Sequence, residues 1–120
     1  MSAKYFKEYE YSCKCGCGKS DLNPELLRML DELRYKCNRP LIINSGCRCE
    51  EHNRKSNGSS TSSHLSGFAV DIKAETSKEK FDIVYNALMS GFRRIGIYSK
   101  FIHLDIDNNK VNPVIFYGGY

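Results

Sequence analysis

The first long alternation of apolar and polar residues along the chain has the spacing of a helix. Four leucines recur at the i, i+4, i+7 rhythm that places side chains on one helical face: Leu26, Leu27, Leu30 and Leu33. Asn23 is a suitable N-cap with Pro24 at the first helical position, and Pro40 ends the helix. Residues 1–20 are aromatic, charged and then rich in glycine and cysteine, and they are predicted to form an extended N-terminal arm.

A second helix is indicated in the latter half of the chain. Thr76 and Glu79 have the spacing of a capping box, which marks a helix start, and Gly91 ends the helix. The apolar residues that this helix carries are Phe81, Val84, Tyr85 and Leu88. A further helical turn is predicted over residues 50–55, and residues 56–63 form a polar loop.

Short runs of β-branched and aromatic residues predict the strands. These runs are residues 41–43, 68–72, 95–98, 101–106 and 114–117, and the third and fourth form a hairpin. The order of helices and strands does not repeat as parallel β-α-β units. We therefore predict an α+β fold with a small antiparallel sheet and flanking helices, in a single domain over residues 1–120.

Composition narrows the classes of function. The 120-residue chain has a net charge of +4, with basic and acidic residues interleaved rather than gathered into the patch that nucleic-acid binding requires. It contains no run of about 18 apolar residues that would insert into a membrane. Residues 1–8 lack the apolar core of a secretory signal. We expect a monomer that is made in a bacterial cytoplasm without a signal peptide and binds no nucleic acid.

Strand alternation gathers polar side chains on one face of the predicted sheet. Within residues 68–72, Asp71 points away from the apolar side, and within residues 101–106 so do His103 and Asp105. If the two strands are neighbours, these three side chains line one cleft.

His64 adds a polar group from the loop before the first of these strands. The small residues Gly67 and Ala69 leave room for a metal, or let the loop fold back over it. His64, Asp71 and His103 offer two imidazoles and a carboxylate, which leave one position of a tetrahedral zinc open for water. Zinc-bound water loses a proton near neutral pH and attacks an amide. On spacing alone, a solvated Asp71 and histidines without a ligand role explain the same residues.

All six cysteines lie in the first half of the chain: Cys13, Cys15, Cys17, Cys37, Cys47 and Cys49. The run from Cys13 to Cys17 is typical of a metal-binding loop, which Cys47 and Cys49 could complete. Structural zinc ligands are usually separated by about two to four residues, which fits only the pair Cys13 and Cys17. Three alternatives stay open: a second, structural zinc ion, disulfides formed after release from the cytoplasm, or free thiols that pack a small loop.

Four segments carry a resemblance to a known family: Ser45 to Asn53, Ser63 to Ile72, Gly96 to Tyr98, and Phe101 to Asp105. In this order they resemble the M15 zinc peptidases, the group of D-Ala-D-Ala carboxypeptidases and phage endolysins that shares its fold with the hedgehog signalling domain. Small phage and prophage members are also similar at Phe6, at residues 13–18 and at residues 23–27. The resemblance covers nearly the whole chain.

The resemblance implies one Zn²⁺ per chain, held by His64, Asp71 and His103. It also implies that the guanidinium of Arg48 points into the cleft, where it would bind a substrate carboxylate or a developing oxyanion. The alternative for Arg48 is a structural salt bridge. Ser63 and Ser45 would support the site or the substrate through hydrogen bonds, or they are turn residues.

The general base departs from the family pattern. Family members carry Glu-x-x-His or His-x-His at the last ligand, where this chain has a lysine and a phenylalanine at positions 100 and 101. Asp105 is the nearest replacement and would act as the catalytic base if it reached the bound water. Its alternative role is to accept the free ring N–H of His103 or to pair with Arg48. His52 is a third, poorer candidate.

The resemblance predicts a zinc metallopeptidase that hydrolyses peptidoglycan stem peptides, as a D-Ala-D-Ala carboxypeptidase or an L-Ala-D-Glu endopeptidase. A non-catalytic zinc-containing binding module of the same fold is the alternative, as is a structural component of a phage particle. As an endolysin, the protein would act at the cell wall after phage-mediated release.

Overall fold

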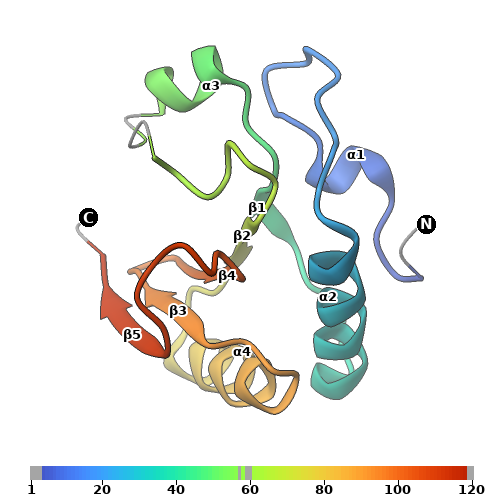
Figure 1. Cartoon of the computed structure of the whole chain (residues 1–120). Helices are drawn as coiled ribbons and strands as arrows, with labels where there is room; N and C mark the ends of the chain where they lie inside the picture. Colours follow the sequence, from blue (N-terminus) through green and yellow to red (C-terminus); the bar gives the residue numbers. More distant parts are fainter. Residues whose placement is uncertain (1–3, 57, 59–60, 119–120) are drawn as a thin grey trace.

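A mixed sheet forms the centre of the computed structural model (Figure 1), which describes residues 4–56, 58 and 61–118. Within these residues the sheet has five strands: β1 (Ile43–Ser45), β2 (Ala69–Lys73), β3 (Arg94–Ile97), β4 (Phe101–Asp105) and β5 (Val114–Tyr117). Their order across the sheet is β1-β2-β4-β3-β5. Neighbouring strands are antiparallel, except that β5 runs parallel to β3. The predicted α+β fold and the β3–β4 hairpin are confirmed, and the parallel β5 makes the sheet mixed.

The first strand lies further along the chain than predicted. Pairing with β2 covers Ile43 and Ser45, with an irregular register between them, rather than residues 41–43. Leu41 is buried, but Ile42 is 56% exposed. The apolar run therefore marks the approach to the sheet edge: the carbonyl of Ile42 accepts a hydrogen bond from the N–H of Lys73 in β2, but the paired residues of the ladder begin at Ile43.

Helix α2 (Pro24–Cys37) begins as predicted. The Asn23 side chain accepts hydrogen bonds from the N–H groups of Glu25 and Leu26, which caps the first turn. All four leucines of the predicted stripe are buried in the core. The helix ends before Pro40, because Asn38 adopts a left-handed backbone conformation (φ 54°) and its N–H bonds back to Arg34.

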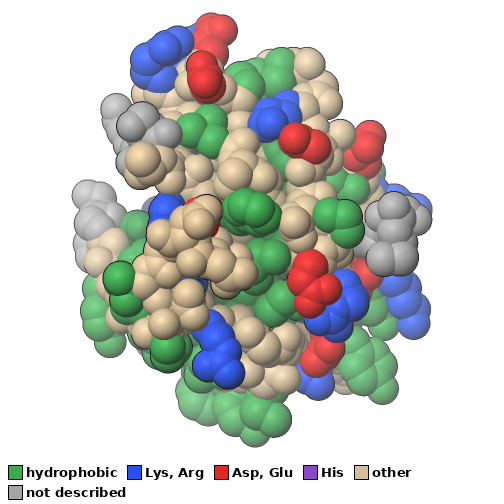
Figure 2. All heavy atoms as spheres, in the orientation of Figure 1, with side chains coloured by type: hydrophobic (Ala, Val, Ile, Leu, Met, Phe, Trp, Pro, Cys, Tyr) green, Lys and Arg blue, Asp and Glu red, His purple; other side chains and the backbone are tan. Residues whose placement is uncertain are grey.

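Helix α4 (Ser77–Met89) opens with the predicted capping box between Thr76 and Glu79. The helix turns a different face inward from the one marked by its largest apolar residues. Ile83 and Ala87 are fully buried, whereas three of the four residues singled out from the sequence are exposed: Phe81, Tyr85 and Leu88. Only Val84 of that set packs against the core. Figure 2 shows hydrophobic side chains gathered at the bottom of the view, over α4.

The N-terminal arm is not simply extended. It contains the short helix α1 (Glu8–Tyr11), and Phe6 and Tyr11 are buried in the main core. Helix α3 (Glu50–Lys55) forms where a helical turn was predicted. In the polar loop that follows it, residues 57 and 59–60 lie outside the described residues. No helix in the described part of the chain is long and apolar enough to cross a membrane.

One face of the sheet supplies the core. Side chains from β2 and β4 on this face are fully buried: Val70, Ile72, Ile102 and Leu104. They join the buried residues of α2 and α4 in one cluster, and α4 also contacts β4 directly. The predicted alternation along both strands is confirmed, so their remaining side chains project toward the opposite face.

Candidate metal centre and polar cleft

Two neighbouring strands bring the predicted ligands together. Strands β2 and β4 are antiparallel, and Asp71 and His103 are direct partners in their register. Ala69 is the partner of Asp105 in the same ladder. Because directly opposed side chains on one face lie close together, the sheet itself places the Asp71 carboxylate beside the His103 ring. The cleft predicted from strand alternation is therefore present.

His64 reaches this face from the turn before β2. Its carbonyl accepts a hydrogen bond from the Arg48 N–H, and its ring Nδ1 lies 2.7 Å from the carbonyl oxygen of Gly46. A Cβ at Gly46 would lie 2.8 Å from the Cα of Tyr11, so only glycine fits between the arm and this turn. Gly67 has a positive φ of 78° and packs against the backbone of Asp21. It thus lets the loop fold back, which was one of its two predicted roles.

Three potential ligand atoms converge beside Asp71. Its Oδ1 atom lies 2.9 Å from Nδ1 of His103 and 3.3 Å from Nε2 of His64. One ligand atom from each residue lies within 4.8 Å of the others. The two imidazole rings are inclined at 67°, with centroids 5.4 Å apart. The spacing is that of ligands around one small cation.

The hydrogen bonds on the far side of each ring test whether this donor set suits a metal. The Gly46 carbonyl can only accept, so His64 carries a proton on Nδ1, and its neutral form directs the Nε2 lone pair toward Asp71. Nε2 of His103 lies 2.7 Å from Oδ2 of Asp105. The carboxylate keeps the ring proton on Nε2, so the unprotonated Nδ1 faces Asp71. Ligating histidines typically donate their second N–H in this way. The residues present fit a zinc ion.

The charges at this centre alter the pKa values of its groups. Burial alone would lower the pKa of His103, but hydrogen bonds to Asp105 and Asp71 raise it to about 9. Burial acts to raise the pKa of Asp71, yet hydrogen bonds with His103 and His64 hold it well below its ordinary value. A positive charge is therefore strongly favoured between these side chains, whether a proton or a metal supplies it.

Asp105 is held firmly and lies behind His103. Its Oδ1 accepts hydrogen bonds from Nε of Arg94 at 2.8 Å and from the N–H of Asp107 at 3.0 Å. Its Oδ2 faces His103, and the residue is 1% exposed. This geometry matches the second role predicted for Asp105, acceptance of the His103 ring N–H. Its cationic partner is Arg94 rather than Arg48.

Arg48 points into the cleft, as the resemblance implied. Nε of Arg48 donates to the Ser45 hydroxyl at 3.1 Å, and Nη1 donates to Oδ1 of Asn53 at 3.2 Å. Nη2 lies 3.6 Å from Oδ2 of Asp71. Ser45 therefore supports Arg48 directly, and the guanidinium borders the three ligand atoms.

The cleft holds about 500 Å³. Besides the ligands, its lining includes Arg48, Arg94, Tyr98 and Lys110. Ser63 also lines it, but its hydroxyl donates to Asp107 at 2.8 Å and accepts from Nζ of Lys110 at 2.9 Å. The hydroxyl that was predicted to bind substrate is thus engaged in tying the loop to the segment after β4.

Sequence reasoning missed Arg94 and Lys110. Arg94 is the partner of Asp105 in the β3–β4 ladder, so extending the predicted hairpin by one residue would have revealed it. Lys110 follows β4 in a turn and had no comparable signal. Conversely, His52 does not line the cleft, and the side chain of Lys100 is exposed.

The structure also brings four of the six cysteines together. The sulfur atoms of Cys13, Cys15, Cys17 and Cys49 lie within 4.8 Å of one another, and Cys37 and Cys47 are not part of this group. All six cysteines belong to the described residues, and each is a free thiol.

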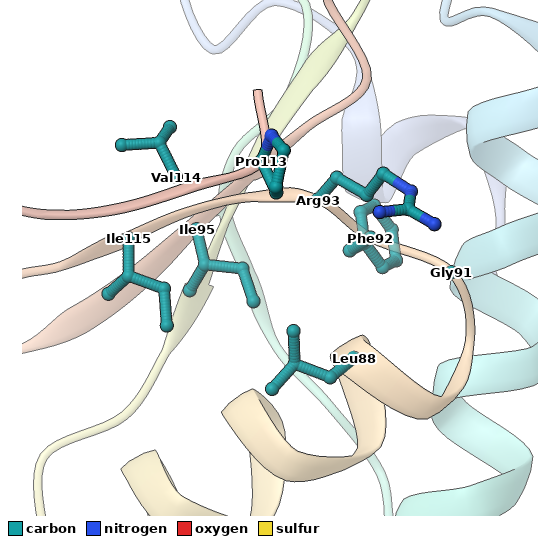
Figure 3. A pocket seen from close by; sticks show the side chains of 8 residues that line it. All are labelled: Leu88, Gly91, Phe92, Arg93, Ile95, Pro113, Val114 and Ile115. Carbon is teal, nitrogen blue, oxygen red and sulfur yellow. The ribbon is translucent and has the colours of Figure 1, made fainter. Parts of the chain in front are cut away.

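A second hollow, of about 530 Å³, lies between the end of α4 and strands β3 and β5 (Figure 3). Leu88, Ile95 and Ile115 face it, and among the described residues that line it Arg93 alone is ionisable. The described residues of this hollow offer no converging polar groups for catalysis, so the polar cleft is the candidate active site.

The chain belongs to the peptidase M15 family. The family model described as Peptidase M15 matches residues 4–105, which include every residue of the candidate metal centre. A search of curated proteins found no match. Family membership indicates a hydrolase of the zinc peptidase type that acts on peptidoglycan.

Proposed function

We propose that this protein is a zinc-dependent peptidase that hydrolyses the stem peptides of peptidoglycan in its polar cleft. The observation that carries the proposal is the convergence of two imidazole nitrogens on Oδ1 of Asp71, with the second nitrogen of each ring held by an acceptor. Such a centre has three protein ligands and opens into a cleft, as catalytic zinc sites do. Membership of the M15 family supports the same function.

His64 would bind the metal through Nε2, His103 through Nδ1 and Asp71 through its carboxylate. When bound, zinc acts as a Lewis acid that lowers the pKa of water and polarises a carbonyl group. The protein holds the two rings in the required tautomers through Gly46 and Asp105.

Positive side chains suit the cleft to an anionic peptide. Arg48 borders the ligand atoms, and its guanidinium is restrained by Ser45 and Asn53. A restrained guanidinium can donate two hydrogen bonds to a carboxylate, or stabilise negative charge that develops on a carbonyl oxygen. Lys110 lines the same cleft. Both substrate types, the D-Ala-D-Ala terminus and the L-Ala-D-Glu bond, present a carboxylate near the scissile amide.

Asp105 would orient His103 rather than serve as the catalytic base. Both of its oxygens already accept hydrogen bonds, and His103 lies between it and Asp71. A base must come within hydrogen-bond reach of the proton that it removes. The described cleft residues include no other carboxylate except Asp71, a proposed ligand.

This absence of a free carboxylate favours a second candidate function. The protein would then be a zinc-containing binding module that retains the family's metal centre and recognises wall peptides without cleaving them. Arg48 and Lys110 would serve the same recognition role in either case.

The test is mass spectrometry of purified muropeptides after incubation with the zinc-loaded protein. We expect new products whose masses identify the bond cut, loss of these products in chelator, and their return with zinc. A His64→Ala protein that cleaves at the normal rate would contradict the proposal. Wild-type protein that binds zinc at His64 and muropeptides in the cleft, yet produces no cleavage, would establish the binding module.

The site of action is also part of the proposal. Peptidoglycan lies outside the cytoplasmic membrane, so the protein must reach the wall, and phage-mediated release is the proposed route. Addition of the protein to isolated walls and to intact cells separates hydrolytic activity from access to the wall. Isolated walls should be digested, and intact cells with an outer barrier should not.

A further inference from the structure

Four cysteine side chains meet at a point away from the polar cleft. Cys13, Cys15 and Cys17 come from the N-terminal arm, and Cys49 is the N-cap residue of α3. Figure 1 shows the N-terminal loop in blue beside the green segment that leads into α3. The sulfur of Cys13 lies 3.4 Å from that of Cys15 and 3.8 Å from that of Cys49, and the sulfurs of Cys15 and Cys49 are 3.6 Å apart.

The backbone of the arm explains how such closely spaced cysteines converge. In an extended chain, Cys13, Cys15 and Cys17 would share a face but lie in a line. Here the N–H of Gly16 bonds to the carbonyl of Cys13, and Gly16 has a φ of 84°, so the chain turns between the first and third cysteines. The N–H of Cys13 bonds to the carbonyl of Lys19, which closes the loop.

The sulfur spacing is that of a tetrahedral metal site. With a zinc–sulfur bond of about 2.3 Å, tetrahedral geometry places neighbouring sulfurs about 3.8 Å apart. The three sulfur–sulfur separations, 3.4–3.8 Å, approach this value. A disulfide requires about 2.05 Å between two sulfurs and would leave the other thiols without a role. Four thiols around one point select a thiophilic ion such as zinc rather than a hard cation.

Backbone N–H groups are already directed at two of the sulfurs. The N–H of Cys49 lies 3.4 Å from the sulfur of Cys13, and the N–H of His52 lies 3.4 Å from the sulfur of Cys49. Hydrogen bonds to the ligand atoms orient them and offset the negative charge that four thiolates retain around a divalent ion. Cys15 and Cys17 are exposed, which gives an ion a path to the site, and Cys13 is buried beneath them.

We propose that Cys13, Cys15, Cys17 and Cys49 bind a structural zinc ion, distinct from the ion of the polar cleft. With all four positions taken by protein, this site has no open coordination position for a substrate and is closed in the way structural zinc sites are. Its ion fastens the N-terminal arm to the start of α3.

The position of Cys49 connects the cysteine site to the polar cleft, and the effect on catalysis rests on the proposed function. Cys49 directly follows Arg48, whose N–H bonds to the carbonyl of His64. On the other side, the N–H of Cys47 bonds to the carbonyl of Tyr11 in the arm. An ion bound by the cysteines would therefore join the arm, α3 and the segment that carries Arg48. The four cysteines are thus positioning residues for the Arg48 guanidinium.

Metal analysis of the purified protein tests the proposal. The described residues contain two candidate sites, so wild-type protein should hold two zinc ions per chain. A Cys15→Ser, Cys17→Ser protein should hold one, and so should His64→Ala, each keeping the other ion. Cys37→Ser is the matched control, because this half-buried thiol lies outside the cluster, and the protein should keep both ions.

Cobalt gives a spectroscopic readout of thiolate ligands in the wild-type protein itself. Cobalt-loaded wild-type protein should show intense thiolate-to-metal charge-transfer absorption, retained in His64→Ala and lost in the cysteine double variant. A single metal ion per chain that His64→Ala removes would overturn the cysteine site and leave the proposed function intact. Iron in place of zinc, or native peptide mapping that finds these cysteines in disulfides, would also overturn it.

Discussion

The Nε2 atom of His103 lies 2.7 Å from Oδ2 of Asp105, two residues further along the same strand. This contact decides which ring nitrogen of His103 faces Asp71, because a proton held on Nε2 leaves Nδ1 free to bind a metal. Arg94 holds the other oxygen of Asp105 at 2.8 Å, so the carboxylate cannot rotate away without breaking an ion pair. A positioning role for Asp105 follows directly from these two contacts.

Asp105→Asn separates that positioning role from catalysis. We expect the zinc affinity of the His64 site to fall by about 10–100-fold, as for other residues that orient a ligand. Hydrolysis should recover at saturating zinc. A catalytic base would instead leave the rate about 10²–10⁴-fold lower at any zinc concentration. Zinc titration of muropeptide hydrolysis, monitored by mass spectrometry, measures both quantities.

Arg48→Lys tests the role of the guanidinium. Lysine keeps the positive charge but cannot hold Ser45, Asn53 and a substrate oxygen with one planar group. We expect kcat/KM to fall by about 10²–10³-fold, the loss typical of one oxyanion donor, with zinc content unchanged. Arg54→Lys, an exposed change on α3, is the matched control and should leave kcat/KM alone. Equal activity of the two variants would assign Arg48 to a structural salt bridge.

The pKa of His103 in the metal-free protein provides a pH test. Its imidazole should titrate at about 9 by NMR, and at lower pH in Asp105→Asn, because that change removes one of the two carboxylates that raise it. The folded pKa exceeds the ordinary value of 6.5, so the stability from this charge is complete below pH 6.5. It is lost as the pH rises through about 9. Titration near 6.5 in wild-type protein would contradict the buried ion pairs.

Gly46→Ala tests the packing of the arm against the segment that directly follows β1. The added methyl group would lie 2.8 Å from the Cα of Tyr11, and backbone atoms cannot move aside as a flexible side chain does. We expect a loss of roughly 1–3 kcal/mol in the free energy of unfolding, as for other overpacked sites. Chemical denaturation measures it, and an unchanged midpoint would show that the arm does not pack there.

Two positions on α4 test which face of the helix is buried. Ile83→Ala should cost about 2–5 kcal/mol, because the side chain is fully buried and leaves a cavity. Phe81→Ala, on the same helix, should change stability by no more than about 0.5 kcal/mol, because Phe81 is 67% exposed. The reverse ranking in thermal unfolding would restore the interpretation drawn from apolar periodicity.

The contrast between α2 and α4 shows when apolar periodicity alone predicts the buried face of a helix. In α2 the four leucines form a continuous stripe, so one face had to be buried, and it is. In α4 the large residues Phe81 and Tyr85 stack on each other at 5.8 Å on the exposed side, while the smaller Ile83 and Ala87 fit against the core. The largest apolar residues therefore identify the buried face of a helix only when no other face of that helix is apolar.

The candidate metal centre was predictable because strand alternation is a local rule. Residues 68–72 and 101–106 each had one apolar face, so Asp71 and His103 had to point the other way. His64 was a candidate from the residues alone, but its assignment as a ligand came from the resemblance, since no local pattern places a loop residue over a sheet. Arg94 was missed because the predicted strand began one residue too late, at residue 95.

The sequence by itself thus determined the α+β class, the helix caps, the apolar strand faces and, through its resemblance, the family. Only the tertiary structure decided that β2 and β4 are neighbours, that Asp105 orients His103, and that a turn at Gly16 gathers four cysteines. The division has a physical reason. Caps and alternation depend on bonds between residues a few positions apart, whereas ligand sets and ion pairs depend on which distant segments the core brings into contact.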